Sequence, residues 1–224
     1  MGGHYYIVKF SPPHGTPFGE RWGALLRLEK LALDTLQSKS VISGQTELVK
    51  SPERTYLQSK RFDYDAHGDR QHIVAIAAVR DEFIGDSRGN WVETAQALHA
   101  QNLITTQELK DIASIFAFGH YIGNTDMHSG NLSFFVDDVI TPKIRLAPVY
   151  DMLPMMWKPD PHHGLSDSPV RKQYMPDGFE QEKAQARQWA VEFWEQAPLL
   201  DIGVELQAAA YESARRLKTN FAHL

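Results

Sequence analysis

The chain has 224 residues, of which 42% are hydrophobic and 23% are charged, enough to bury a core in one large domain or two small lobes. Its formal net charge of −5 excludes the chain as a whole as an electrostatic partner of nucleic acid or anionic membrane. It has no cysteine, which excludes disulfides, thiolate metal sites and cysteine nucleophiles and fits a reducing cytoplasm. No apolar run approaches the roughly 20 residues of a membrane span.

The first third of the chain predicts a small sheet packed against one helix. Tyr5–Phe10 is an aromatic and β-branched run that favours a strand. Apolar residues at spacings of three and four predict a helix over Phe18–Gln37. Two more strands are expected at Val41–Lys50 and Thr55–Phe62, separated by a Ser-Pro break. This order is typical of a small mixed sheet with one packed helix.

The rest of the chain favours helices. Ile73–Val79 is an apolar run that fits either a strand or a buried helix. Thr105–Ile122 is the clearest helix, because Thr105 and Glu108 form a capping box ahead of an apolar face. The other expected elements are a loop at Gly85–Asn90, a helix at Trp91–Ala100, a loop at Gly123–Asn131, a hairpin of Leu132–Val136 and Lys143–Leu146, loops at Ala147–Pro159 and His162–Gly178, and helices at Glu180–Glu195 and Ile202–Phe221.

The chain changes from sheet-rich before about Asp63 to helix-rich after about Trp91. This change predicts two lobes, residues 1–65 and residues 66–224. A cleft between two lobes is a common place for a ligand, so we expect the functional site there.

A polar loop between the long helix and the hairpin carries the residues that suggest chemistry. Asp126 and Asn131 lie five positions apart in this loop, and Asp151 follows a short strand twenty residues later. Phosphoryl transfer to a hydroxyl needs one carboxylate to accept the proton, and an amide oxygen with a second carboxylate to hold Mg²⁺. Polar loop residues are also ordinary turn formers, so spacing alone leaves the catalytic and the structural interpretations equally weighted.

The motif NTDMHSGNLSFF, followed by LAPVYDMLP, resembles the signature of HipA-like C-terminal kinase domains. The matching residues are Thr125, Asp126, His128, Asn131, Phe134, Leu146, Pro148, Tyr150 and Asp151. The resemblance implies that Asp126 is the catalytic base and that Asn131 and Asp151 are ligands of Mg²⁺. It also implies that the phosphate side of an ATP site is lined by His128, Ser129, Gly130, Asn131, Tyr150 and Asp151.

The strand YYIVKF places Lys9 where HipA-like proteins carry the lysine that pairs with ATP. A strand lysine by itself is better interpreted as solvent-facing, so this role rests on the resemblance. In kinases the following helix supplies a glutamate that orients the lysine. Glu29 fits the family spacing best, and Glu20 is the alternative.

The hinge that clasps adenine in this family, usually Glu-Arg-Phe-Asp, corresponds here to Lys60, Arg61, Phe62 and Asp63. Lys60 replaces the usual Glu, and because backbone groups can still bind adenine, we expect a changed nucleotide preference rather than a lost site. Only eight residues precede Lys9, where the family has a phosphate-binding loop and a small extra subdomain. We therefore expect a fragment that lacks this loop and binds Mg-ATP weakly at best.

The resemblance implies an α+β, protein-kinase-like fold with a small incomplete β-rich N-lobe and a mostly helical C-lobe. The implied function is that of an ATP-dependent serine/threonine protein kinase, the toxin of a toxin–antitoxin system in the cytoplasm. Implied partners are a protein substrate, such as an aminoacyl-tRNA synthetase, and a helix-turn-helix antitoxin or a fused N-terminal DNA-binding domain. No direct binding of nucleic acid or membrane is expected from these residues.

Two alternatives stay open. The missing phosphate loop favours a catalytically silent interaction or regulatory domain of a larger DNA-binding transcriptional regulator. A small-molecule phosphotransferase shares the Asp…Asn…Asp pattern, but its loop usually begins His-Gly-Asp and not Thr-Asp-x-His.

Two further clusters are interpreted as structural. The pair His162-His163 has no third ligand at a convincing spacing and predicts a surface loop rather than a metal site. An apolar cluster after Asp151 is expected to pack against the larger lobe rather than form an activation-segment-like surface; its members are Met152, Met155, Met156 and Trp157.

Overall fold

The computed structural model describes residues 5–85, 89–138, 143–160, 164–165 and 174–219. His162-His163 lies outside the described residues, as do parts of the loops expected at Gly85–Asn90 and His162–Gly178. In the described part of the chain, no helix is long and apolar enough to cross a membrane.

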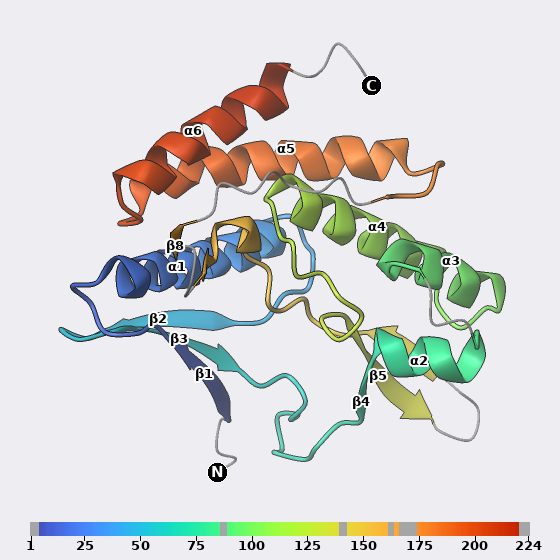
Figure 1. Ribbon diagram of the computed structural model, residues 1–224. Coiled ribbons are helices and arrows are strands. Elements are labelled where there is room, and N and C mark those ends of the chain that lie inside the picture. Colours follow the sequence, from blue (N-terminus) through green and yellow to red (C-terminus); the bar gives the residue numbers. More distant parts are fainter. Residues whose placement is uncertain (1–4, 86–88, 139–142, 161–163, 166–173, 220–224) are drawn as a thin grey trace.

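A three-stranded antiparallel sheet and one long helix form the N-terminal part of the fold (Figure 1). The strands β1 (Tyr6–Phe10), β2 (Thr46–Lys50) and β3 (Thr55–Lys60) pair in the order β1-β3-β2. The helix α1 (Pro17–Ser38) begins at Thr16, whose side chain caps the amide of Gly19. The predicted strands and helix are therefore confirmed in kind.

The predicted second strand is too long at its start. The expectation of a strand from Val41 is wrong, because β2 begins at Thr46. Residues just before β2 pair instead with the segment that leads to Asp151: Ser43 forms a parallel bridge with Val149, and the amide of Gly44 donates to the Val149 carbonyl at 2.8 Å. This pairing joins the N-terminal part of the chain to the C-terminal part.

The following part of the chain contains a second antiparallel sheet, of order β4-β5-β6. The apolar run Ile73–Val79, which fitted either a strand or a helix, is part strand and part helix: β4 (Ile73–Ala75) passes directly into α2 (Ile76–Phe83). The remaining elements are α3 (Trp91–Ala100), α4 (Thr106–Tyr121), β5 (Ser133–Asp138), β6 (Lys143–Leu146), the 3₁₀ turn η1 (Met155–Trp157), β7 (Pro159–Asp160), β8 (Gly164–Leu165), α5 (Glu180–Gln196), the 3₁₀ turn η2 (Ala197–Leu199) and α6 (Val204–Thr219).

The two ends of α4 explain how the polar loop is placed. At its start, Thr105 and Glu108 form the predicted capping box, and Glu108 Oε1 also accepts the amide of Leu146 on β6 at 2.9 Å. At its end, Gly123 has φ +77°, and a Cβ there would meet Met156 Sδ at 2.1 Å. Glycine is therefore required where the chain leaves α4 and enters the loop.

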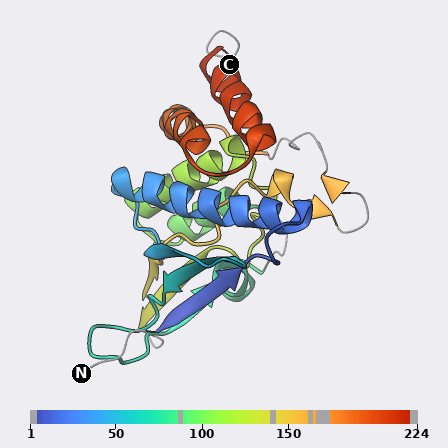
Figure 2. The same cartoon turned by 90° about the vertical axis from the view of Figure 1, so that its left-hand side faces the viewer.

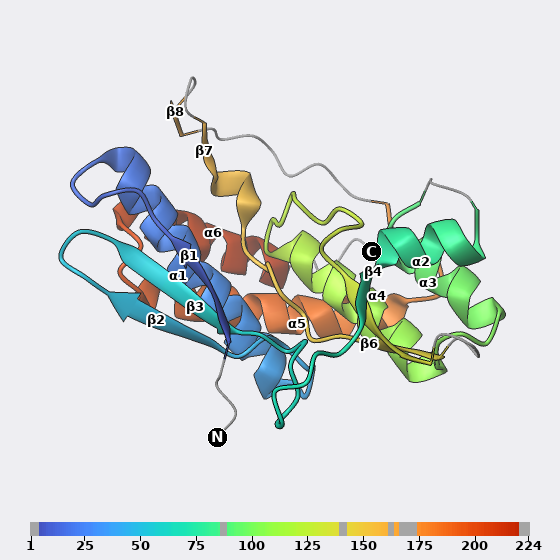
Figure 3. The same cartoon turned by 90° about the horizontal axis from the view of Figure 1, so that it is seen from below.

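The buried apolar side chains of the described residues form a core that runs through both parts of the chain. α1 lies between the three-stranded sheet and α5, as Figures 2 and 3 show from two directions. Leu25, Leu28 and Leu36 of α1 are fully buried in the same cluster as Phe118 and Phe193. The predicted lobes at 1–65 and 66–224 thus share this core, and where one lobe ends and the other begins stays a prediction.

The apolar cluster after Asp151 packs as expected. Met152 is fully buried, and the Trp157 ring lies 5.0 Å from that of Trp194. Met155 and Met156 are partly buried against the core. These side chains hold the segment after Asp151 against α4 and α5.

Replacing a central aromatic side chain should cost much of the stability. Phe193 is fully buried, with its ring 4.6 Å from that of Trp194, so Phe193→Ala is expected to lower the free energy of unfolding by about 3–5 kcal/mol. Leu199 is 82% exposed, and Leu199→Ala should change it by no more than about 0.5 kcal/mol. Urea denaturation followed by tryptophan fluorescence measures both. Equal losses in the two variants would contradict this core.

Candidate functional site

An ion-pair cluster joins β1, α1 and the loop after β6. The Nζ of Lys9 lies 2.5 Å from Glu29 Oε1 and also donates to Asp151 Oδ1. The Glu29 side chain is 2% exposed, whereas those of Lys9 and Asp151 are each 35% exposed. Three segments far apart in the sequence therefore meet at one ammonium group.

Burial dominates the ionisation of Glu29. Loss of water raises the pKa of Glu29 to about 7, against the opposing attraction of Lys9. Its Oε2 atom is buried and has no hydrogen-bond partner among the described residues. Burial would lower the pKa of Lys9, but the charges and hydrogen bonds of Glu29 and Asp151 outweigh it and raise this pKa. Lys9 thus stays an ammonium ion at neutral pH, while burial makes Glu29 harder to ionise than an exposed glutamate.

A cavity of about 360 Å³ opens beside this cluster. Ile7 and Lys9 are two positions apart on β1, and Ser59 pairs with Ile7, so all three line it from one face of the sheet. The other lining residues are Glu29, Leu33, Gly44, Thr46, Lys60, Arg61, Phe62, Asp63, Ile73, Ser133, Tyr150 and Asp151. The volume is within the range of small-molecule sites, about 300–1,000 Å³. The cavity suits a ligand with both an apolar and an anionic part.

The predicted hinge residues form one wall of the cavity. Arg61 holds Asp63 through two hydrogen bonds, of 2.9 and 2.5 Å, and these bonds lower the pKa of Asp63. The ring of Phe62 lies 5.9 Å from the ring of Tyr150 and 6.1 Å from that of Phe135. The structure therefore brings Lys60, Arg61 and Phe62 together with Lys9 and Asp151, as the sequence predicted.

Asn124 organises the polar loop that contains Asp126. It is 3% exposed, and its Oδ1 accepts the amide of Asp126 at 3.0 Å while its Nδ2 donates to the Asp151 carbonyl at 3.4 Å. Asn131 Nδ2 donates to the Asp126 carbonyl at 3.0 Å. Two side chains thus hold the backbone of Asp126 by hydrogen bonds, and Asp126 as a whole is exposed to solvent.

The other residues of the polar loop lie near two different cavities. The Tyr150 hydroxyl donates to the Gly130 carbonyl at 2.8 Å and shares a 2.7 Å hydrogen bond with Ser133, which ties the loop to the cavity beside Lys9. His128 and Ser129 line a different cavity, on the side of α2 and α3. The structure therefore does not bring these two residues to the wall of the cavity that holds Lys9.

The choice between Glu29 and Glu20 as partner of Lys9 is decided by the structure. Glu20 lies at the start of α1, where it accepts the amide of Gly15 at 2.9 Å and pairs with His14 at 3.3 Å. Glu29 lies about two and a half turns further along α1 and faces the cavity. The sequence predicted Glu29, and it is the glutamate that contacts Lys9.

Sequence reasoning missed the roles of Asn124 and Ser133. Both lie within the quoted motif, but an asparagine in a loop is normally interpreted as a turn former. No local pattern shows that Asn124 is buried or that it reaches Asp151, 27 residues later. Asp151 itself has φ +57°, a left-handed conformation that is uncommon outside glycine, and the contact with Asn124 helps to hold it there.

Comparison with known proteins gives a consistent result. The model of the HipA-like C-terminal domain matches residues 1–220. The chain is 37% identical over 174 residues to "Toxin YjjJ" of Escherichia coli (strain K12), a match that covers 77% of this chain and 38% of that protein. The chain therefore spans well under half the length of this relative.

Two solved structures have the same fold. HipA of Shewanella oneidensis MR-1, solved as a complex with HipB and its operator DNA, has a TM-score of 0.58 at 15% identity, over 95% of this chain and 56% of that one. The proinflammatory kinase CtkA of Helicobacter pylori has a TM-score of 0.59 at 14% identity, over 95% of this chain and 86% of that one. These likenesses confirm the predicted α+β, protein-kinase-like fold.

The raised pKa of Glu29 predicts a pH-dependent difference in stability between wild type and Glu29→Gln. A carboxyl whose pKa is raised by folding stabilises the folded state most below its unfolded pKa of 4.5, and this contribution is lost as pH rises through about 7. As pH rises from 4.5 to about 7, the free energy of unfolding of the wild type should fall by up to roughly 3 kcal/mol relative to that of Glu29→Gln, with little further change above pH 8. Urea denaturation at several pH values measures the two free energies, with Glu53→Gln in the exposed β2–β3 turn as the matched control. A difference that does not vary with pH would contradict the raised pKa.

Proposed function

Because the chain belongs to the HipA-like C-terminal domain family, we propose that it is an ATP-dependent serine/threonine protein kinase domain of a HipA-like toxin. The observation that carries this proposal is the position of Lys9 between Glu29 and Asp151, at the wall of a cavity large enough for a nucleotide. A buried glutamate that orients a strand lysine beside a loop carboxylate is the arrangement that kinases use to hold ATP phosphates.

ATP fits the character of the cavity beside Lys9. Its adenine would lie between the sheet face at Ile7 and the aromatic ring of Phe62, near the hinge. Its phosphates would reach the other end, where the Lys9 ammonium is the nearest cation. Lys60 in place of the usual hinge glutamate lines the same cavity and is expected to alter which nucleotide is preferred.

Asn131 and Asp151 have the donor atoms that Mg²⁺ prefers, an amide oxygen and a carboxylate. The Nδ2 of Asn131 is directed to the Asp126 carbonyl, which leaves its Oδ1 as the atom for a metal. Among the described residues, no group of three or more histidine and acidic side chains gathers as a metal site, so phosphate and water oxygens would complete the shell. When bound, Mg²⁺ supplies neutralisation of phosphate charge.

Asp126 is the proposed catalytic base. Its carboxylate would accept the proton of a serine or threonine hydroxyl as the oxygen attacks the terminal phosphate. Asn124 and Asn131 hold the backbone of Asp126 by hydrogen bonds, so its position is set before the substrate arrives. Asn124 also contacts Asp151, which keeps the base and the metal ligand in a fixed relation.

The proposed partners follow from the family. We propose a protein substrate, with an aminoacyl-tRNA synthetase as one candidate, and a cytoplasmic location where ATP is supplied. The Shewanella HipA complex contains HipB and operator DNA. By analogy, a helix-turn-helix antitoxin or a fused N-terminal DNA-binding domain is the proposed route of this chain to DNA.

A second candidate function is a catalytically silent regulatory domain of a larger DNA-binding regulator. The observation that favours it is the ion pair of Asp151, a proposed metal ligand, with Lys9. A silent domain would keep this contact permanently, whereas Mg-ATP binding to a kinase would compete with Lys9 for Asp151.

Removing the proposed base separates the two candidates. Asp126→Asn is expected to lower incorporation of labelled phosphate from ATP into a serine-containing substrate by about 10²–10⁴-fold, because the hydroxyl loses its proton acceptor. Mg-ATP affinity should change by less than about threefold, since no nucleotide contact is removed. Asp137→Asn, on the half-exposed end of β5, is the matched control. If wild type and Asp126→Asn are equally inert, the silent candidate is favoured, whereas equal transfer by both would exclude Asp126 as the base.

The pairing of Lys9 with Asp151 predicts opposite effects of Asp151→Asn with and without metal. Without Mg²⁺, the variant should bind ATP at least as well as wild type, because Lys9 is no longer held by a carboxylate. Adding Mg²⁺ should raise the ATP affinity of wild type, and in the variant this increase should be smaller by about tenfold or more, since the metal loses a charged carboxylate ligand. Calorimetry in Mg²⁺ and in EDTA measures the two affinities, with Asp34→Asn on α1 as the control. An unchanged gain would exclude Asp151 as a metal ligand.

A further inference from the structure

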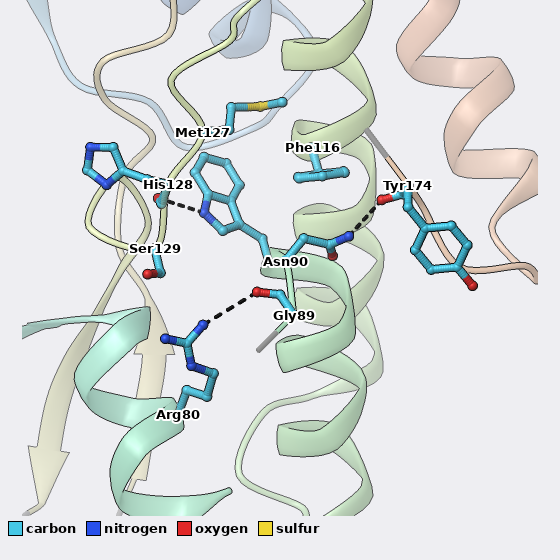
Figure 4. A pocket seen from close by; sticks show the side chains of 9 residues that line it. Arg80, Gly89, Asn90, Phe116, Met127, His128, Ser129 and Tyr174 are labelled. Carbon is cyan, nitrogen blue, oxygen red and sulfur yellow. Dashed lines mark hydrogen bonds between the residues drawn. The ribbon is translucent and has the colours of Figure 1, made fainter. Parts of the chain in front are cut away.

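A second cavity, of about 460 Å³, lies on the other side of the polar loop, between α2, α3 and α4 (Figure 4). Its wall includes Met127, His128 and Ser129 of the loop, Arg80 of α2, and Asn90 and Trp91 at the start of α3. None of these residues lines the cavity beside Lys9. This cavity is lined by the polar loop itself, whereas the cavity beside Lys9 is joined to the loop through Tyr150, whose hydroxyl donates to the Gly130 carbonyl.

Arg80 is a buried cation with few partners. Its side chain is 10% exposed, and its Nε atom is buried with no hydrogen-bond partner among the described residues. Its Nη1 makes one long hydrogen bond, 3.4 Å, to the Gly89 carbonyl, drawn in Figure 4. The carboxylate of Asp81 lies 3.7 Å away but is 63% exposed, so water screens it. The buried guanidinium therefore has one donor, Nε–H, without a hydrogen-bond partner among the described residues, and one long hydrogen bond from Nη1.

The surroundings of Arg80 favour an anion. A guanidinium presents paired N–H groups that match a carboxylate or a phosphoryl group. Gly89 and Asn90 lead into the ten-residue helix α3, whose dipole adds positive potential at this end. That end is already capped, because Asn90 Oδ1 accepts the amides of Val92 and Glu93, and Glu93 Oε2 accepts the amide of Asn90 at 2.8 Å. Asn90 also donates its Nδ2 to the Tyr174 carbonyl at 2.6 Å. Among the described residues that line this cavity, the buried donor without a partner is the Nε of Arg80.

The other walls are apolar and are tied to the polar loop. Trp91, Phe116 and Met127 are each at most 8% exposed and line the cavity around Arg80. The indole Nε1 of Trp91 donates to the His128 carbonyl at 2.9 Å. An anionic side chain with an apolar stem would fill this shape, and its binding would be felt directly at the loop.

We propose that this cavity binds an anionic side chain of the protein substrate, a carboxylate or a phosphoryl group, close to the hydroxyl that accepts phosphate. The inference rests on the proposed kinase function of Asp126. Ser129 follows Asp126 by three residues, so their Cα atoms lie no more than about 11 Å apart. An extended peptide covers this distance with about three residues, which places the anionic residue roughly three to five positions from the acceptor serine.

Direct binding is measured on the whole chain through the indole N–H of Trp91 in ¹⁵N-labelled protein. The probes are O-phosphoserine, N-acetylaspartate and the uncharged N-acetylasparagine. Both anionic probes should shift the Trp91 signal, and the uncharged one should not. A response to phosphoserine alone would assign the cavity to phosphoryl groups, and a response to aspartate alone to carboxylates. No response of Trp91 to either anion in the folded protein would overturn the proposal.

Two variants test the role of Arg80. Arg80→Gln removes the guanidinium charge, and Asn90→Asp adds a carboxylate to the same cavity while keeping a residue that caps helices equally well. Each should weaken binding of the anionic probe by at least about tenfold. Arg215→Gln removes an exposed arginine on α6 and is the matched control, expected to bind like wild type. Wild-type affinity in both cavity variants would overturn the proposal, and Asn90→Asp answers the question even if Arg80→Gln does not fold.

Phosphate transfer then separates this inference from the proposed function. Nine-residue peptides with a central serine and either aspartate or asparagine four positions away are compared as substrates. A lower KM for the aspartate peptide, lost in Asn90→Asp with kcat kept, supports the substrate role. Equal KM values for the two peptides would overturn it. Anion binding at Trp91 without transfer to any peptide would contradict the kinase function and leave only an anion site.

Discussion

The contact of Lys9 with Glu29 and Asp151 is the interaction on which the rest of the site depends. A single ammonium group fixes β1 against α1 and against the loop after β6. Its partner Glu29 is almost fully buried, so loss of water opposes its ionisation while the charge of Lys9 favours it. Under the proposed function, Mg²⁺ would compete with Lys9 for the carboxylate of Asp151.

The second constraint is the coupling of two loops through Asn124. This buried side chain accepts the amide of Asp126 and donates to the carbonyl of Asp151, whose backbone is left-handed. The two loops are therefore joined by the hydrogen bonds of a single side chain. Arg80 and Trp91 line a second cavity together with His128 and Ser129 of the loop that contains Asp126, and the indole of Trp91 donates to the His128 carbonyl.

Much of the fold and part of the site could be predicted from local pattern. The capping box of Thr105 and Glu108 and the spacing of apolar residues in α1 identify helices, because these signals act within a few residues. The predicted second strand is too long, because Ile42, Ser43 and Gly44 pair with Val149 and not with the three-stranded sheet. The family motif indicated Asp126, Asn131 and Asp151 without requiring any knowledge of how the chain folds.

The sequence by itself determined the kinds of residue present, the order of the elements and the family motif, since these depend on neighbours in the chain. Only the tertiary structure decided that Glu29 and not Glu20 contacts Lys9, and that His128 faces a second cavity. It also decided that Arg80 is buried and that its Nε lacks a hydrogen-bond partner among the described residues. Burial and charge pairing are set by groups brought together across many residues, and no local pattern records which groups will meet.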